Sequence, residues 1–222
     1  MVKTEKAAER SEGGSRVVPW TVLSSETTYE DRWLKLRSDH CVDADGRSIA
    51  PYHVIERPDW VNVVALTHSG QLVLVREYRH GVGQVMLGLV CGGIEADDGP
   101  DLAARIEGAA RRELLEETGY EAERWLPILA TFPNSANHSN RVTSFLALGA
   151  ELRAVQQLDD NEAIEVAPDD FVDVVLRVRD GAMTMQAMDV AALWSAVARI
   201  LLGGPALGDI APLQARLLEA LT

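Results

Sequence analysis

The hydrophobic residues of this chain first fall into short runs typical of β-strands. The segments 61–67 (VNVVALT) and 71–78 (QLVLVREY) are rich in β-branched residues and are separated by His68-Ser69-Gly70, which predicts a hairpin. A third apolar run, at 85–92, ends in the pair Gly92-Gly93. We therefore expect a group of strands that ends at this glycine pair.

A helix is expected directly after these strands, from Pro100 to Thr118. Proline is common at the first helical residue, Asp98 and Asp101 put negative charge at the positive end of the helix dipole, and Gly119 stands where a helix often ends. Strands are also expected at 33–42, 141–149 and 163–167. Further helices are expected from 168–170 to Gly181, at 187–202 and at 212–221. This irregular alternation predicts an α+β fold, with a mixed sheet and helices on its faces.

The chain divides into four segments. Residues 1–16 are typical of a flexible tail, and residues 17–57 of a small N-terminal antiparallel β unit with a hairpin turn at Asp45-Gly46. Arg57-Pro58-Asp59 marks the boundary with a main domain at 58–205. Residues 206–222 are expected to form a C-terminal helical extension.

Composition and charge narrow the possible partners. The 222 residues include 21 basic and 34 acidic side chains, for a formal net charge of −13. Because no basic run offsets this charge, nucleic acid and anionic membrane surfaces are not expected partners. The chain has two cysteines without metal spacing, residues 1–16 lack the apolar core of a secretory signal, and no apolar run reaches about 18 residues. A cytoplasmic location is therefore expected.

The candidate chemistry lies at the end of the first predicted helix, in the run RELLEETGY at 112–120. Glu113, Glu116 and Glu117 are related by three and four positions, so a helix presents their carboxylates on one face. Like charges held so closely oppose one another, and Arg112 cannot neutralise three carboxylates. Mg²⁺, which prefers hard oxygen ligands, is the natural remaining partner, whereas a solvated acidic helix end is the alternative.

With its glycines, this run resembles the Nudix box, whose pattern is G-x5-E-x7-R-E-U-x-E-E-x-G-U, where U is aliphatic or bulky. Arg112 through Tyr120 match the second half position by position. The first half departs from the pattern, because 18 residues separate Gly93 from Arg112 instead of 13. Ala104 occupies the position of the first box glutamate, for which Glu95 or Glu107 could substitute.

The resemblance extends over about residues 55–202 and is closest to the ADP-ribose and nucleotide-sugar pyrophosphatase branch. It implies a Nudix-type α/β/α sandwich, preceded by a small β domain that often mediates a homodimer. It also implies a Mg²⁺-dependent (Mn²⁺ possible) cleavage of a nucleoside diphosphate-linked small molecule by water. Two differences from that branch are GLVCGG at 88–93, where the branch usually shows W-E-L-P-A-G, and Ala136, at a position where many relatives carry proline.

Carried over by position, the resemblance assigns roles to single residues. The metal ligands would be Glu113, Glu116, Glu117 and the carbonyl of Gly92, with Arg112 and Glu116 in the catalytic machinery. Glu162 is the first candidate for the general base and Glu165 the second, although a solvated acidic loop would also explain both. The candidates for substrate contact are Arg79, Arg76, Glu95 and Trp60, of which the arginines could be ordinary strand-end cations and Trp60 a packed core residue.

Two functions remain open at this point. The first is a Nudix pyrophosphatase that cleaves ADP-ribose or a similar nucleoside diphosphate sugar to a nucleoside monophosphate and a sugar phosphate; GDP-sugars and dinucleoside polyphosphates are further possible substrates. The second is a Nudix-fold sensor that binds a nucleotide metabolite without turnover. The three retained acids favour the first function, whereas the altered first half of the box leaves the second open.

Overall fold

The computed structural model of the chain describes residues 17–32, 34–158 and 163–222. It divides into two compact units, at residues 1–57 and 58–222. Each unit has its own sheet.

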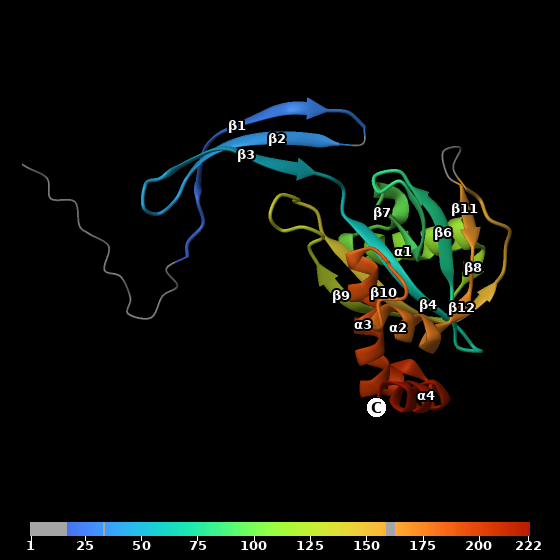
Figure 1. Ribbon diagram of the computed structural model, residues 1–222. Coiled ribbons are helices and arrows are strands. Elements are labelled where there is room, and N and C mark those ends of the chain that lie inside the picture. The colour runs from blue at the N-terminus through green and yellow to red at the C-terminus, as the bar shows by residue number, and fades with distance from the viewer. Residues whose placement is uncertain (1–16, 33, 159–162) are drawn as a thin grey trace, which may run out of the picture. The chain divides into compact units, whose positions relative to one another are not determined.

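The described part of the first unit is an antiparallel sheet in the order β1-β2-β3 (Figure 1). Its strands are β1 (Thr21–Glu30), β2 (Lys35–Val42) and β3 (Ser48–Glu56). The turn predicted at Asp45-Gly46 joins β2 to β3: the amide of Gly46 donates to the carbonyl of Asp43 over 3.1 Å, and Gly46 has a φ of 81°. A positive φ of this size favours glycine, which explains why the turn forms here.

The second unit is built on a mixed sheet whose main path among the described residues runs β11-β6-β7-β4-β10-β8. Only β4 and β10 pair in parallel; the other described pairs are antiparallel. The strands are β4 (Trp60–Thr67), β5 (Gln71–Leu72), β6 (Leu74–Arg79), β7 (Gln84–Gly93), β8 (Tyr120–Glu121), β9 (Arg124–Thr131), β10 (Val142–Leu152), β11 (Ile164–Val166) and β12 (Asp169–Asp170).

The predicted hairpin at 61–78 is only partly correct. Leu66 pairs with Leu72 across a short turn, but the chain then leaves β4, and β6 pairs with β7 and β11 instead. Alternating hydrophobicity identifies strands but does not specify which strand lies beside which, because pairing depends on contacts distant in sequence.

The strand β9 was not expected from the sequence. It contains Pro127, which lacks the amide needed for a regular ladder and lowers the strand signal of its segment. In the structure β9 pairs with β10, and the register shifts between Leu129 and Pro127. The proline is therefore accommodated at an irregularity of the ladder.

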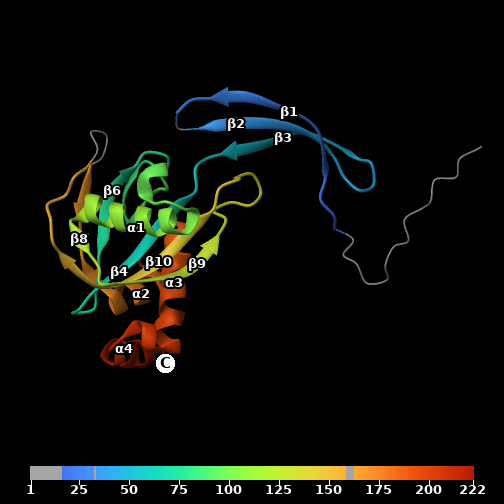
Figure 2. The ribbon, with the colours of Figure 1, turned by 180° about the vertical axis from the view of Figure 1, so that it is seen from behind.

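Helices cover both faces of the sheet, as the α/β/α prediction requires. Figure 2 shows α1 (Leu102–Thr118) in front of the sheet, whereas Figure 1 shows α2 (Phe171–Arg179) and α3 (Ala187–Leu202) in front of the opposite face. Ala109, Ala110 and Leu114 of α1 share a buried cluster with Val63 and Val90 of the sheet. A second buried cluster joins α2 and α3 to the sheet on the other side.

The ends of α1 follow the local sequence, with one correction. The helix begins at Leu102 rather than at Pro100, because the side chain of Asp101 caps it by accepting a hydrogen bond from the amide of Ala104 over 2.9 Å. It ends as predicted at Gly119, which has a φ of 74° and whose amide donates to the carbonyl of Leu115 over 2.7 Å.

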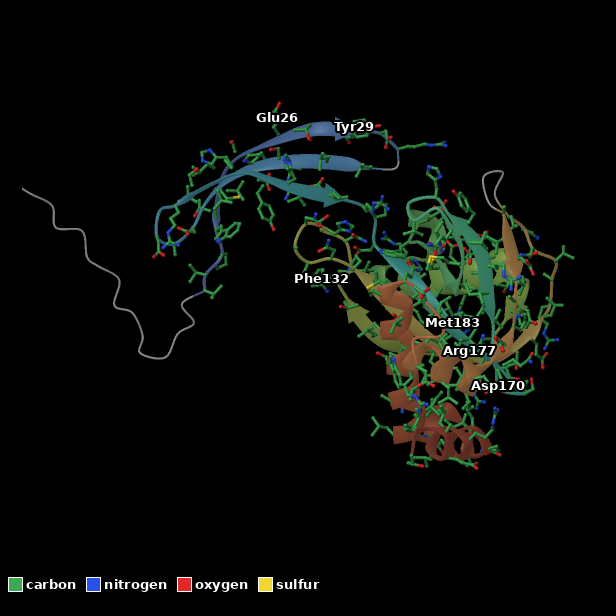
Figure 3. All side chains as sticks on the ribbon, in the orientation of Figure 1. Glu26, Tyr29, Phe132, Asp170, Arg177 and Met183 are labelled. Carbon is green, nitrogen blue, oxygen red and sulfur yellow. The ribbon has the colours of Figure 1, made fainter. Side chains whose placement is uncertain are left out.

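The last helix, α4 (Ala211–Leu221), packs on α2 and α3, with Leu217 fully buried. Asp170 connects these helices: it caps α2 by accepting from the amides of Val172 and Asp173, and both of its oxygens accept from Arg216 of α4 at 2.7 Å. Figure 3 labels Asp170, the residue directly before α2, and Arg177, which belongs to that helix. Within the described ranges, no helix is long and apolar enough to cross a membrane.

Candidate functional site

The candidate site is built where the end of β7 meets the second half of α1. A Cβ atom placed on Gly92 would lie 1.9 Å from the carboxyl carbon of Glu113 and 2.0 Å from one of its oxygens. The Glu113 carboxylate therefore rests directly on the backbone of Gly92, in space that any other residue would fill. The structure thus brings together two of the residues that the sequence analysis grouped.

Arg112 organises the acidic face of α1. Its Nη1 donates to Glu113 Oε1 over 2.9 Å and to Glu116 Oε2 over 3.0 Å, and its Nη2 donates to the carbonyl of Gly93 over 2.9 Å. Its Nε donates to Asp98 Oδ1 over 2.8 Å. Burial alone would lower the pKa of Arg112, but its hydrogen bonds to Asp98 and Glu116 and the charge of Glu113 outweigh burial and raise it. The guanidinium is therefore a fixed positive charge.

Glu117 completes this face and is buried, with 6% of its surface exposed. It lies close enough to the Cys91 thiol to affect its ionisation: burial first, and then the charges of Asp189 and Glu117, raise the pKa of Cys91 to about 12. The thiol therefore stays protonated near neutral pH.

A cavity of about 470 Å³ lies over β6 and β7, beside the start of α3. Its lining includes Glu77, Arg79, Met86, Met185, Gln186 and Asp189. Arg79 forms an ion pair with Glu77 at 3.0 Å, and its Nη2 also approaches the sulfur of Cys91 at 3.7 Å. Arg79, which lines the cavity, therefore contacts the residue that directly precedes Gly92 in β7.

Asp189 is the buried acid of this cavity, and the sequence analysis did not identify it. Its Oδ1 accepts from Asn62 and Gln186 over 3.2 and 3.1 Å, and its Oδ2 accepts from the amide of Leu89 over 3.1 Å. Burial raises its pKa to about 6, although these hydrogen bonds act in the opposite direction. An isolated aspartate near the start of an apolar helix gives no signal of such burial in the sequence.

Comparison with known families decides the identity of the larger unit. The family model of the NUDIX domain matches residues 56–185, more than half of the chain. The chain belongs to the Nudix family. The family model described as the nucleoside diphosphate sugar hydrolase N-terminal domain matches residues 20–55, within the first unit.

Two relatives of this Nudix chain illustrate that its similar proteins carry different names. An ADP-ribose pyrophosphatase of Mycobacterium tuberculosis is 35% identical over 130 residues, which cover 57% of this chain and 58% of that protein. A methanol dehydrogenase activator of Bacillus methanolicus is 27% identical over 163 residues, which cover 72% and 80%.

A solved structure supports the fold assignment. The crystal structure titled ADP compounds hydrolase superposes with a TM-score of 0.70 at 21% identity and covers 82% of this chain and 95% of that one. The Nudix fold predicted from the sequence, with a small antiparallel β unit before it, is thereby confirmed, and that unit has three strands among the described residues.

The donors available for a divalent metal, which Nudix proteins typically use, are all oxygen atoms. Among the described residues, no group of three or more His, Cys, Asp or Glu side chains is already arranged around an ion position. Instead, Glu113 and Glu116 both bond to Arg112. The close seating of Glu113 on Gly92 and the hard character of the carboxylates nevertheless fit a hard divalent cation.

The remaining predicted site residues lie in different places. Arg76 forms a 2.8 Å ion pair with Glu165 across β6 and β11, so these two side chains engage each other. Trp60 is half-buried at the start of β4, opposite Gly93 in the ladder. Glu95 is exposed, and its amide donates to Asp98. Glu162 lies outside the described residues.

Neither proposed substitute for the first box glutamate contacts Arg112 in the described structure. Glu107 forms an ion pair with Arg111 at 2.7 Å, and the backbone amide of Glu95 donates to the side chain of Asp98. The acid that does contact Arg112 from the altered segment is Asp98, which the sequence analysis had considered only as a charge near the helix start. A possible signal in the sequence was Gly108, an unusual residue inside a helix.

Proposed function

We propose that this Nudix hydrolase cleaves the pyrophosphate of ADP-ribose or a related nucleoside diphosphate sugar, yielding a nucleoside monophosphate and a sugar phosphate. The observation that carries the proposal is the seating of Glu113, one of three acids on α1, on Gly92, with the cavity residue Arg79 in contact with the adjacent Cys91. The name of the Mycobacterium tuberculosis relative and the description of the N-terminal domain family support this substrate class.

The acidic face of α1 would hold the metal. Glu113, Glu116 and Glu117, with the carbonyl of Gly92, are the proposed ligands of Mg²⁺ or Mn²⁺. When bound, the cation would neutralise pyrophosphate charge and favour attack by water on phosphorus. Arg112 would hold Glu113 and Glu116 in place through its two Nη1 hydrogen bonds.

Arg79 would bind a phosphate oxygen of the substrate. A guanidinium suits this role because its planar set of donors matches the geometry of phosphate. The cavity of about 470 Å³ falls in the size range of small-molecule sites. Glu162 is the proposed general base, which would accept a proton from the attacking water. This assignment rests on the family resemblance.

We further propose that the protein is a homodimer joined through its first unit. All ten residues of β1 are exposed in the single chain, and Val22, Leu23 and Tyr29 among them are large hydrophobic residues. β1 is an edge strand of its sheet, and the unpaired backbone groups of an exposed edge strand can pair with another chain. Light scattering of the full chain at several concentrations would test this, and a monomer at micromolar concentration would contradict it.

The decisive experiment measures turnover. ADP-ribose, ADP-glucose and GDP-mannose would be incubated with the protein and Mg²⁺, and a phosphatase would release phosphate from the monoester products. We expect turnover that stops on chelation with EDTA and falls about 100-fold or more in Glu117→Gln, the order of loss seen when one stabilising group is removed. Glu107→Gln, which neutralises a glutamate paired with Arg111 on the same helix, is the matched control and should keep its activity.

The alternative is a sensor that binds a nucleotide metabolite without turnover, and one relative is indeed named an activator. Absence of turnover with every substrate, combined with thermal stabilisation by one of them, would support the sensor and contradict the hydrolase. Turnover that persists in Glu117→Gln would contradict the role of the acidic face.

A further inference from the structure

The segment between β7 and α1 carries an acid that contacts the centre of the site. We propose that Asp98 is a positioning residue, which fixes the orientation of Arg112 and through it the carboxylates of Glu113 and Glu116. This inference deepens the proposed function, since it concerns the same acidic face. It also places an acid beside α1 in a chain that has Ala104 at the position where the Nudix box has a glutamate.

Two glycines allow the segment to lie against α1. Asp98 ends the short 3-10 helix Ala96–Asp98, and a Cβ atom at Gly108 of α1 would lie 2.0 Å from the backbone oxygen of Asp98. A Cβ atom at Gly99 would lie 2.7 Å from the backbone of Ala104. The segment is therefore packed directly on the helix, and Gly108 lies one turn before Arg112, on the same helix face.

Asp98 is buried at this contact, with 4% of its side chain exposed. Its Oδ1 accepts from Arg112 Nε over 2.8 Å, and its Oδ2 accepts from the amide of Glu95 over 2.6 Å and from Arg112 Nη2 over 3.4 Å. Burial by itself would raise the pKa of Asp98, but the hydrogen bonds from Arg112 and from the Glu95 amide lower it. The carboxylate is therefore ionised near neutral pH.

The guanidinium of Arg112 has five N–H groups, and the structure gives five acceptor contacts. Nε and one Nη2 contact go to Asp98, the other Nη2 contact goes to the carbonyl of Gly93, and Nη1 serves Glu113 and Glu116. Because the group is planar, fixing its Nε edge on Asp98 fixes the direction in which Nη1 points. Asp98 therefore determines how the two glutamates are presented.

Removing the Asp98 charge should release Arg112 toward the remaining carboxylates. Arg112 would then compete with a divalent cation for Glu113 and Glu116. Loss of an outer group that orients metal ligands typically costs about 10–100-fold in metal affinity or activity, and we expect Asp98→Asn to weaken Mn²⁺ binding by about tenfold or more. The substrate KM should change less than kcat, because Asp98 does not line the Arg79 cavity.

The test compares Asp98→Asn with Asp97→Asn in the full chain. Asp97 is exposed in the same short helix, so its variant makes the same charge change without the contact to Arg112. Mn²⁺ affinity, measured by titration calorimetry or electron paramagnetic resonance, is the primary readout, with kcat, KM and the thermal midpoint measured in parallel. Gly108→Ala provides a second route, because it keeps every charge but displaces the Asp98 backbone.

Weaker Mn²⁺ binding in Asp98→Asn and Gly108→Ala, with Asp97→Asn like the wild type, would support the inference. If Asp98→Asn does not fold, the Mn²⁺ affinity of Gly108→Ala decides whether Asp98 positions Arg112. Equal Mn²⁺ affinity in all folded variants, or a wild-type chain that binds no Mn²⁺, would overturn it, as would a lower thermal midpoint with unchanged Mn²⁺ affinity. If the wild type turns over none of the substrates, the proposed function fails while the Mn²⁺ comparison still decides the role of Asp98.

Discussion

The carboxylate of Glu113 occupies the space that a side chain at Gly92 would need: a Cβ atom there would lie within 1.9 to 2.4 Å of its three carboxyl atoms. Gly92 is the penultimate residue of β7, and Glu113 lies on the acidic face of α1. This contact requires a residue without a side chain for steric reasons alone, since the φ of Gly92 is not in the left-handed region. It locates the candidate site at one point of the fold.

Gly92→Ala should therefore inactivate the protein by displacing Glu113. We expect kcat to fall about 100-fold or more, because a small misplacement of reacting groups can cost that much. Gly93→Ala is the control, since a Cβ atom at Gly93 meets nothing within 4 Å and the carbonyl that accepts from Arg112 is retained. Steady-state turnover of both variants checks this, and equal activity in the two would contradict the role of the contact.

Arg79→Ala should raise the KM for a nucleoside diphosphate sugar. A hydrogen bond to a charged group contributes about 1.5–3 kcal/mol, which corresponds to an increase of roughly 10–100-fold. Arg76→Ala should change the KM less than about twofold, because Arg76 is paired with Glu165 and does not line the cavity, and exposed ion pairs contribute little. Initial rates over a range of substrate concentrations separate these outcomes, and an equal effect of both substitutions would exclude the proposed contact.

The raised pKa of Asp189 predicts a pH dependence of stability. The folded chain keeps this proton up to about pH 6, whereas the unfolded chain releases it near the ordinary value of 3.8. Between these values the folded state binds more protons, so its free energy of unfolding falls as the pH rises, by about 3 kcal/mol in total. This contribution of protonated Asp189 to the free energy of unfolding is fully present below pH 3.8 and is lost above pH 6.

The asparagine in Asp189→Asn has no proton to release in this range, so the variant should lack this part of the pH dependence of stability. Urea unfolding at half-unit steps from pH 4 to pH 7 should find the stability difference between wild type and Asp189→Asn shrinking as the pH rises. Asp173→Asn, at an exposed position of α2, serves as the parallel control. A constant difference across the range would show that Asp189 ionises normally.

Asp170 should stabilise the C-terminal helices more than its ion pair alone suggests. Asp170→Ala removes the cap of α2 and the contact to Arg216, for an expected loss of about 1–2 kcal/mol in the free energy of unfolding. Arg216→Ala removes only the partly exposed ion pair and should cost about 0–1 kcal/mol. Chemical denaturation measures both, and an equal loss in the two variants would argue against the cap.

The helices of this chain were largely predictable because their signals are local. The helix at 187–202 was predicted with its observed bounds, and the end of α1 follows from the left-handed conformation that Gly119 adopts easily. The predicted start of α1 was wrong by two residues, because Asp101 caps the helix and Pro100 therefore lies before it rather than at its first position. The strand β9 was not predicted because it contains Pro127, and the effect of a proline on a strand depends on its place in the sheet.

The sequence by itself determined the acidic face of α1, the Nudix family resemblance and the division into a small β unit and a mixed α/β unit. These follow from spacing along one helix and from local strand and helix periodicities, which need no knowledge of distant contacts. Only the tertiary structure decided that Glu113 rests on Gly92, that Asp98 holds Arg112, and that Arg79 and Asp189 line one cavity. Each of these relationships joins segments separated along the chain by between 14 and 110 residues, and their approach depends on how the sheet and helices pack together rather than on any local pattern.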